Sequence, residues 1–164
     1  MNIKVLFVCL GNICRSPMAE AVFRHKVEQA GLSGVIEIDS AGTGDWHIGH
    51  PPHEGTRKLL DKKSISYKGM RARQVSADDF SEFQYIICMD TNNLRDVRQL
   101  LKLEASTVEE GTELALFAFM ELLPEKALAD VPDPYYTGNF TYVYELIDAG
   151  CAKLLNKIRT ERKL

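Results

Sequence analysis

The sequence has few of the features that mark secreted, metal-binding or membrane proteins. Its four cysteines are too few and too scattered for a disulfide framework, and none forms the C-x-x-C pair of a zinc site. No apolar run approaches the ~20 residues that span a bilayer, and the N-terminus lacks a basic region followed by an apolar signal core. We therefore expect a cytoplasmic protein with no membrane partner.

The chain also lacks an excess of charge of one sign. It has 20 Lys and Arg and 23 Asp and Glu, which gives a formal net charge of -3. This overall charge does not indicate a nucleic-acid partner. A solvated helix face accounts best for the local basic stripe of Arg95, Arg98 and Lys102. Residues 1–164 contain no linker or repeat, and 45% of them are hydrophobic, so we expect a single, mostly monomeric domain with at most weak self-association.

Apolar segments of two kinds alternate along the chain. Strand-like runs rich in β-branched and aromatic residues lie at residues 3–9, 35–39, 84–89 and 114–119. Helix-like patterns lie at residues 17–30, 52–63, 92–102 and 139–160. This alternation predicts an α/β fold, in which a parallel sheet is covered by helices on both faces and ligands bind at the carboxyl ends of the strands.

Between the first strand and the first helix the sequence CLGNICRS, residues 9–16, combines a thiol, a turn and a fixed positive charge. The spacing suits an anion: backbone N–H groups of the turn can surround a phosphate, and Arg15 closes the ring with two parallel hydrogen bonds. Ser16 as N-cap and Pro17 as first helical residue predict a helix start here. A free thiol has a pKa of about 8.5, whereas the pKa of a thiol at a helix N-terminus beside a cation can fall to roughly 3.5–7.5. We therefore expect Cys9 to act as a nucleophile without a separate base.

Other residues predict the surroundings of this loop. Gly11 permits close backbone approach, and Asn12 tolerates a left-handed conformation. The second and third strands end at Ser40 and Asp90 respectively, so these ends are candidates for one shared pocket wall. The segment 130–136, DVPDPYY, predicts an ordered loop over that pocket. The remaining cysteines, Cys88 and Cys151, lie in apolar patterns and are expected in the core.

These sequences resemble the signature of the low-molecular-weight protein tyrosine phosphatases. VLFVCLGNICRSPMAEAVF at 5–23 looks like the family's catalytic loop, and DPYY at 133–136 looks like its acid loop. The similarity continues through DSAGT at 39–43, ARQV at 72–75 and CMDTNNLR at 88–95. It implies a three-layer, flavodoxin-like α/β/α domain with a four-stranded parallel sheet. It also implies hydrolysis of phosphotyrosine and small aryl phosphates to inorganic phosphate, with no metal or other cofactor.

The resemblance gives each candidate residue a role. Cys9 would form a cysteinyl-phosphate, Arg15 would bind the phosphoryl group, and Asp133 would serve as general acid and then as base. Ser40 and Asp90 would support the loop. The substrate-binding positions would be Leu10, Gly11, Asn12, Ile13, Cys14, Ser16, Trp46 and Tyr135. Among these, Asn12 would also help to hold the loop's shape, Ser16 would stabilise the thiolate, and the two aromatic residues would wall a deep slot for a phenyl ring.

Several alternatives and one departure remain open. The family often has a histidine where this chain has Met70, which leaves the support of the loop open.

Arsenate reductases of the same architecture need a downstream cysteine pair, and Cys88 has no such neighbour. Related arginine phosphatases carry a small polar residue at the position of Ile13, and a non-enzymatic phosphate-binding module needs neither nucleophile nor acid. Cys14 either forms a reversible disulfide with Cys9 or is a buried bystander.

Overall fold

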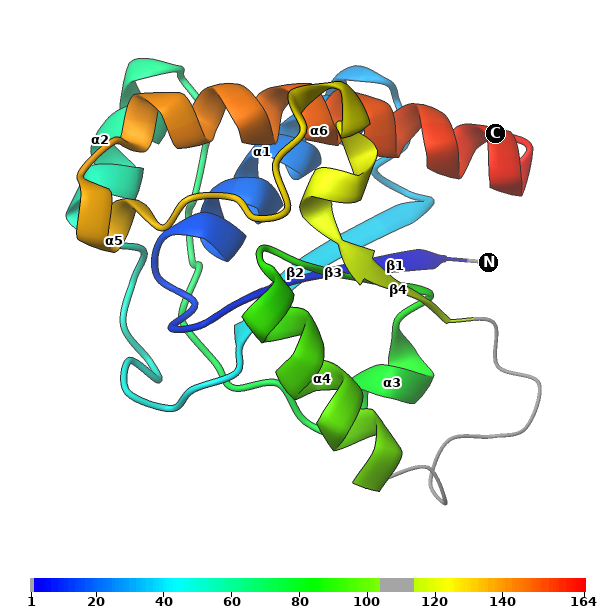
Figure 1. The fold of residues 1–164 in the computed structure, drawn as a ribbon. Helices are drawn as coiled ribbons and strands as arrows, with labels where there is room; N and C mark the ends of the chain where they lie inside the picture. The colour runs from blue at the N-terminus through cyan, green and yellow to red at the C-terminus, as the bar shows by residue number, and fades with distance from the viewer. Residues whose placement is uncertain (1, 104–113) are drawn as a thin grey trace.

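A computed structural model describes residues 2–103 and 114–164. Four strands form one parallel sheet in the order β2-β1-β3-β4 (Figure 1). The strands are β1 (Ile3–Cys9), β2 (Ile36–Gly42), β3 (Tyr85–Cys88) and β4 (Ala115–Ala118). β1, β3 and β4 are short, mostly apolar runs, as expected for strands that helices cover on both faces. β2 lies at the edge of the sheet and carries the polar residues Glu37, Asp39 and Ser40.

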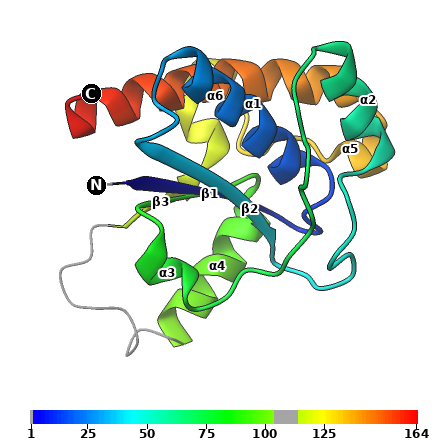
Figure 2. The ribbon, with the colours of Figure 1, turned by 180° about the vertical axis from the view of Figure 1, so that it is seen from behind.

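Helices cover both faces of this sheet. They are α1 (Arg15–Gln29), α2 (Glu54–Lys62), α3 (Asp79–Glu82), α4 (Thr91–Leu103), α5 (Pro134–Thr137) and α6 (Phe140–Arg162). Two 3-10 turns, η2 (Phe119–Leu122) and η3 (Pro124–Lys126), follow β4. Figures 1 and 2 show α1 and α6 on one face, with α2 beside them, and α3 and α4 on the other. The predicted three-layer α/β/α fold is confirmed.

The side chains of β1 divide between two hydrophobic cores. Val5 and Phe7 point into the core beneath α1 and α6, while Leu6 and Val8 point into the core beneath α3 and α4. This alternation follows from the two-residue period of a strand. Because both faces are buried, β1 is fixed in register, and its last residue, Cys9, is fixed with it.

The catalytic-loop sequence lies where the strand order reverses. From β1 the chain crosses to β2 on one side, and it returns to place β3 on the other side. The carboxyl end of β1 is therefore the switch point at which open α/β sheets bind ligands. Among the described residues, no helix is long and apolar enough to cross a membrane.

Most predicted boundaries agree with the structure within two residues, and the exceptions have local causes. β2 runs on to Gly42, because its last residues pair with the end of β1. Ser16 is not an N-cap, since α1 begins at Arg15 and the Ser16 hydroxyl is directed at Cys9. The segment 130–136 is a loop only in part, because Asp133 caps the short helix α5. Residues 1 and 104–113 of the predicted single domain lie outside the described residues.

Candidate active site

The loop of residues 9–15 is held from outside through its carbonyl groups. The contacts are Thr43 N to Cys9 O at 2.9 Å, Gly44 N to Leu10 O at 2.9 Å, His53 N to Ile13 O at 2.7 Å, and Thr56 Oγ1 to Cys14 O at 3.2 Å. Carbonyl groups that point outward leave the N–H groups of the same loop facing inward, which is the arrangement of a backbone anion site. One of these, Asn12 N–H, donates to Cys9 Sγ at 3.2 Å.

Asn12 fixes the turn of the loop. Its φ is 56°, in the left-handed region that few residues other than glycine adopt. Its buried amide Nδ2 donates to Ser16 Oγ and to Ser40 Oγ, each at 2.9 Å, and its Oδ1 accepts from Arg73 N at 3.0 Å. Three hydrogen bonds from three different segments therefore hold the side chain, and they compensate for the unfavourable backbone conformation.

Glycine at the end of β2 lets the loop lie close to the sheet. A Cβ on Gly42 would lie 2.8 Å from Leu10 O, closer than real Cβ contacts come, and an unusually tight 3.2 Å from Asn12 Cβ. The DSAGT sequence therefore contributes to the site through this glycine, as well as through Ser40.

The Cys9 thiol lies at the centre of these donors. The residue is buried, and its Sγ is 2.9 Å from Ser16 Oγ in addition to the Asn12 N–H. The N-terminus of α1 is adjacent, because that helix begins at Arg15. The Ser16 hydroxyl, the Asn12 N–H and the positive end of a helix thus surround the sulfur with groups that can stabilise negative charge on it.

Arg15 is buried and fully charged. Its Nη1 donates to Asp90 Oδ2 at 2.9 Å and to Val131 O at 2.8 Å, while Nη2 lies 3.4 Å from Asp133 Oδ2. Burial alone lowers the pKa of this guanidinium, but the negative charges of Cys9, Asp133 and Asp90 outweigh burial and raise the pKa above its ordinary value. Because Nη1 is held by Asp90 and Val131, the opposite edge of the guanidinium is the one presented to a ligand.

Asp133 is placed by the start of α5. Its Oδ1 accepts a hydrogen bond from Tyr135 N at 3.0 Å, which makes it the N-cap, and Pro134 occupies the first helical position. The other oxygen, Oδ2, faces Arg15. The cap thus orients a carboxylate over the loop while its side chain keeps 22% of its surface exposed.

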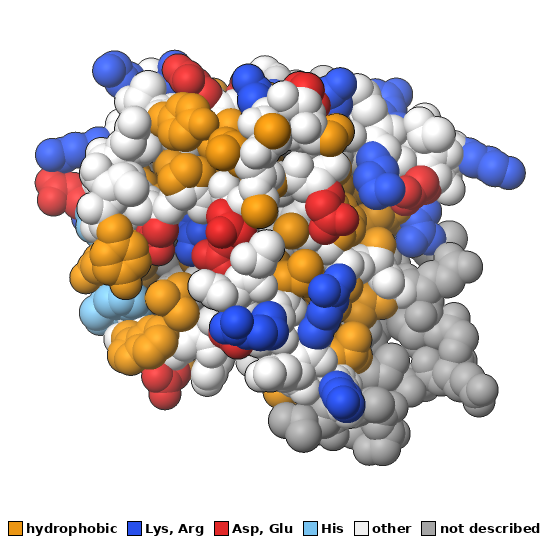
Figure 3. Space-filling model, viewed as in Figure 1, with side chains coloured by type: hydrophobic (Ala, Val, Ile, Leu, Met, Phe, Trp, Pro, Cys, Tyr) orange, Lys and Arg blue, Asp and Glu red, His pale blue; other side chains and the backbone are white. Residues whose placement is uncertain are grey.

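A cavity of about 190 Å³ opens above Cys9. This volume suits one aryl phosphate group better than a drug-sized ligand, for which roughly 300–1,000 Å³ is typical. The residues that line it are Cys9, Leu10, Gly11, Ile13, Cys14, Arg15, Trp46, His47, Asp133, Tyr135 and Tyr136. Its aromatic walls are open to solvent: Trp46 is 66% exposed and Tyr136 is 75% exposed. Figure 3 shows hydrophobic side chains gathered beside a histidine on the edge of the molecule where α5 lies.

The walls are supported mainly by ring packing. The Tyr135 ring meets the edge of His53, with centroids 5.9 Å apart, and His53 stacks on Phe140 at 5.3 Å. On the other side the Trp46 ring folds back over Gly44, where a Cβ would come within 1.8 Å of the indole. Such contacts fix the walls less firmly than hydrogen bonds fix the loop.

The predicted residues do gather at one place, but not all of them face the cavity. Asn12, Ser16 and Ser40 lie behind the loop and hold it, and Asp90 holds Arg15 directly. Nine of the expected residues line the cavity, from Cys9 to Tyr135. Two residues that line it, His47 and Tyr136, are absent from the predicted set; their neighbours Trp46 and Tyr135 were the available signal.

Glu20 is a further residue that the sequence pattern did not reveal. Ser40 Oγ donates to Glu20 Oε1 at 2.6 Å, and Arg24 pairs with the other oxygen. Burial raises the pKa of the Glu20 carboxyl, and the Arg24 charge partly opposes that rise. Glu20, held by Arg24, therefore supports Ser40 from α1, and Met70 lies beside Asn12 and Ser40 where the family often has a histidine.

Cys88 and Cys151 are buried as predicted, and Cys14 is also buried although it lines the cavity. Burial raises the pKa of Cys14 to about 12 and that of Cys88 to about 12. Cys151 lies in the core beneath α1 and α6. Within residues 2–103 and 114–164, no cluster of three or more His, Cys, Asp or Glu side chains is arranged to hold a metal ion.

The site combines a buried cysteine in an anion loop with an arginine beside it and a carboxylate above it, at the end of a parallel α/β sheet. This combination defines a cysteine-dependent phosphatase. A family profile described as low molecular weight phosphotyrosine protein phosphatase matches residues 4–164. The chain belongs to this family, and it is a protein-tyrosine-phosphatase that acts on phosphoproteins and releases phosphate.

Individual relatives agree with this assignment. The low molecular weight protein-tyrosine-phosphatase YfkJ of Bacillus subtilis is 50% identical over 162 residues, or 99% of each chain. Its crystal structure has a TM-score of 0.90 and covers 98% of this chain and 97% of that one. PtpA of Staphylococcus epidermidis is 42% identical, with 99% of this chain and 97% of PtpA covered. The crystal structure of DARP, a Drosophila arginine phosphatase, is 31% identical with a TM-score of 0.85, over 96% of this chain and 98% of that one.

Proposed function

We propose that Cys9 is the nucleophile of the first half-reaction. The thiolate attacks phosphorus, a P–S bond forms, and the bond from phosphorus to the phenolic oxygen breaks. Asp133 gives its proton to the departing oxygen, so the leaving group departs as a neutral phenol. The support for this assignment is the place of Cys9 Sγ beneath the cavity, 2.9 Å from Ser16 Oγ and 3.2 Å from Asn12 N, where both groups can donate to an attacking sulfur.

The second half-reaction reverses these roles. Water attacks phosphorus while the Asp133 carboxylate takes a proton from it, and the P–S bond breaks to release inorganic phosphate and the Cys9 thiolate. Ser16 Oγ, 2.9 Å from the sulfur, stabilises that leaving thiolate. The Asp133 carboxyl serves both steps, because it loses its proton to the leaving group in the first step and acts as a carboxylate base in the second.

Charge that develops on the phosphoryl oxygens is met by Arg15 and the inward N–H groups of the loop. Since Nη1 is committed to Asp90 and Val131, we infer that Nε and Nη2 bind two phosphoryl oxygens in parallel. That contact replaces the 3.4 Å approach of Asp133 to Nη2 and frees the carboxyl to face the leaving group. The site is thus organised before the substrate arrives.

The aromatic walls support phosphotyrosine as the substrate. Trp46 and Tyr135 flank the cavity, and a flat phenyl ring between them places its phosphate within reach of Cys9. Phosphoarginine is the competing candidate, because DARP is an arginine phosphatase. The apolar side chain of Ile13, which lines the cavity, favours the phenyl ring over a polar guanidinium.

Two further candidate functions have weaker support. Arsenate reduction needs a thiol that attacks in turn, yet Cys14 and Cys88 are buried and their pKa of about 12 keeps both protonated near neutral pH. A binding module needs no acid above the phosphate, where Asp133 lies. We also expect the protein to be cytoplasmic and mostly monomeric.

Burst kinetics test the proposed mechanism. The wild-type protein is mixed with p-nitrophenyl phosphate, quenched in acid, and digested to locate phosphate on a peptide. We expect a burst of nitrophenol close to one equivalent and phosphate on the Cys9 peptide, with neither in Cys9→Ser. Turnover that survives in Cys9→Ser, or phosphate on another residue, would overturn the assignment.

A further inference from the structure

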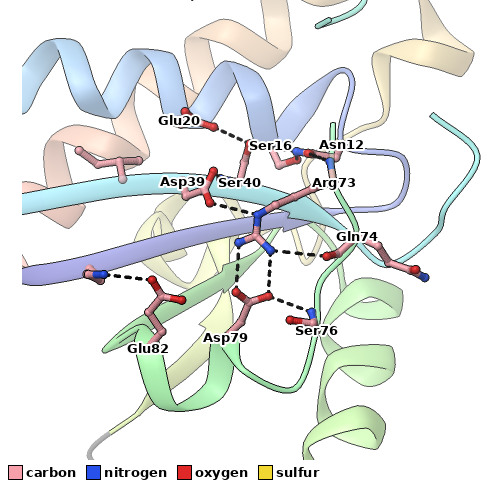
Figure 4. Close-up of polar contacts among 12 residues, drawn as sticks. Asn12, Ser16, Glu20, Asp39, Ser40, Arg73, Gln74, Ser76, Asp79 and Glu82 are labelled. Atoms are coloured by element: carbon pink, nitrogen blue, oxygen red, sulfur yellow. Dashed lines mark hydrogen bonds and ion pairs between the residues drawn. The ribbon is translucent and has the colours of Figure 1, made fainter. Parts of the chain in front are cut away.

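Arg73 joins three parts of the molecule that surround the back of the catalytic loop. Its Nε donates to Asp39 Oδ2 on β2 at 3.1 Å, and its Nη1 and Nη2 bind the two oxygens of Asp79 on α3, each at 3.1 Å. Figure 4 shows the guanidinium between these two carboxylates. Asp79 is buried while the Arg73 side chain keeps 33% of its surface exposed, so the carboxylate is shielded from water and the bidentate contact fixes the plane of the guanidinium.

The same residue reaches Asn12 by two routes. Through its backbone, Arg73 N–H donates to Asn12 Oδ1 at 3.0 Å. Through its side chain it holds Asp39, whose other oxygen accepts from Ser40 N at 2.8 Å, and Ser40 Oγ in turn accepts from Asn12 Nδ2 at 2.9 Å. Both ends of the Asn12 amide are therefore positioned by contacts that meet at Arg73.

The segment that carries Arg73 has little other regular structure. Residues 73–75 pair with the last residue of β2 through Gly42 N to Arg73 O and Val75 N to Gly42 O, both at 2.8 Å. This is a single bridge outside the named strands, and residues 66–72 before it form no helix or strand. Ala72 is also bound to the turn before α2, through Ala72 N to His50 O and Gly49 N to Ala72 O, both at 2.8 Å. The side-chain contacts to Asp39 and Asp79 add a second anchor, on the side of the sheet and α3, for the backbone N–H that binds Asn12.

We propose that Arg73 is a positioning residue of this phosphatase, which keeps the catalytic loop in its phosphate-binding shape by holding Asn12 from both sides. It does not line the cavity and touches no reacting atom. Loss of its side chain removes the contact to Asp39 and loosens the segment whose N–H binds Asn12 Oδ1, so Asn12 and the N–H groups of the loop are positioned less precisely. The proposal rests on the phosphate-binding role of residues 9–15 proposed above.

Arg73→Met tests the proposal, and Lys4→Met is the matched control. Lys4 also carries a cation that bridges β2 and α3, through Glu37 at 3.4 Å and Glu82 at 3.0 Å, but it lies far along the sheet from the loop. Both variants are measured well below their melting temperatures. We expect kcat on p-nitrophenyl phosphate to fall about tenfold, and the inhibition constant of inorganic phosphate to rise about fivefold, in Arg73→Met alone.

Two milder variants keep the test decisive should Arg73→Met fold poorly. Arg73→Lys retains the charge but cannot bind Asp39 and both oxygens of Asp79 at once, so we expect it to recover less than half of the lost kcat. Asp39→Asn weakens the contact between Arg73 Nε and residue 39. We expect kcat to fall about threefold and the inhibition constant of phosphate to rise, as in Arg73→Met.

A structural role without positioning would lower the melting temperature and leave both kinetic quantities unchanged. Wild-type kcat and phosphate inhibition in Arg73→Met or Asp39→Asn, beside an intact wild-type burst, would overturn the role of Arg73 while the proposed function stands. Turnover that survives in Cys9→Ser, or phosphate on a residue other than Cys9, would instead overturn the proposed function.

Discussion

The two ends of the active site are built in different ways. At the phosphate end, Cys9, Asn12 and Arg15 are almost completely buried, and hydrogen bonds to several elements fix each of them. At the aryl end, Trp46 and Tyr135 are more than half exposed and are supported mainly by ring contacts. Both ends line one cavity, but the first is buried and polar and the second is exposed and apolar.

This difference assigns catalysis to the phosphate end of the site and the choice of substrate to the aryl end. Transition-state stabilisation needs donors that are already aligned, because realignment during the reaction costs free energy. Recognition of a flat ring tolerates small movements, since dispersion and hydrophobic contacts have little directionality. Variants of the phosphate end should therefore change kcat, and variants of the aryl end should change KM or the preference among substrates.

The largest effect is expected for Arg15→Lys, which keeps the charge but removes the planar fork. A lysine cannot hold Asp90 and Val131 and bind two phosphoryl oxygens at the same time. We expect kcat on p-nitrophenyl phosphate to fall about 1,000-fold, at the upper end of losses for a single charge-stabilising group. A fall of less than tenfold in steady-state assays would show that the phosphate end does not depend on this geometry.

Asp133→Asn should give a loss that depends on the leaving group. The Asn side chain can still accept from Tyr135 N–H and cap α5, so the loop over the cavity is retained. We expect kcat/KM to fall about 300-fold for phenyl phosphate, whose phenol is a poor leaving group, and less than about tenfold for p-nitrophenyl phosphate. Equal losses on the two substrates would contradict the role of Asp133 as general acid.

The sequence predicted the residues that gather at the site better than the contacts that support them, and the reason is physical. Cys9 and Arg15 are placed by the strand before them and the helix after them, so local sequence suffices. Helix and strand types are likewise set by periodicity, and the fold was confirmed. Contacts made by distant segments, such as Arg73 with Asn12 or Glu20 with Ser40, depend on tertiary packing and have no local signal. His47 reaches the cavity through an irregular turn after β2, and its neighbour Trp46 was the only signal for it.

A smaller effect is expected at Ile13, which belongs to the loop but faces the substrate ring. We expect the wild-type protein to prefer a phosphotyrosine peptide over a phosphoarginine peptide at least tenfold in kcat/KM, about 1.4 kcal/mol in transition-state discrimination. Ile13→Thr keeps the β-branched shape and adds a hydroxyl, so it should narrow this ratio several-fold. A wild-type preference that is equal or reversed would remove the assignment of phosphotyrosine as the better substrate.

The division between the two ends is tested most directly by inorganic phosphate, a ligand with no ring. Its competitive inhibition constant is measured for Trp46→Ala and for Asn12→Ala against the wild-type protein. We expect Trp46→Ala to bind phosphate within about twofold of wild type while its KM for p-nitrophenyl phosphate rises about fivefold, and Asn12→Ala to bind phosphate at least fivefold more weakly. Equal weakening of phosphate binding in the two variants would contradict the account.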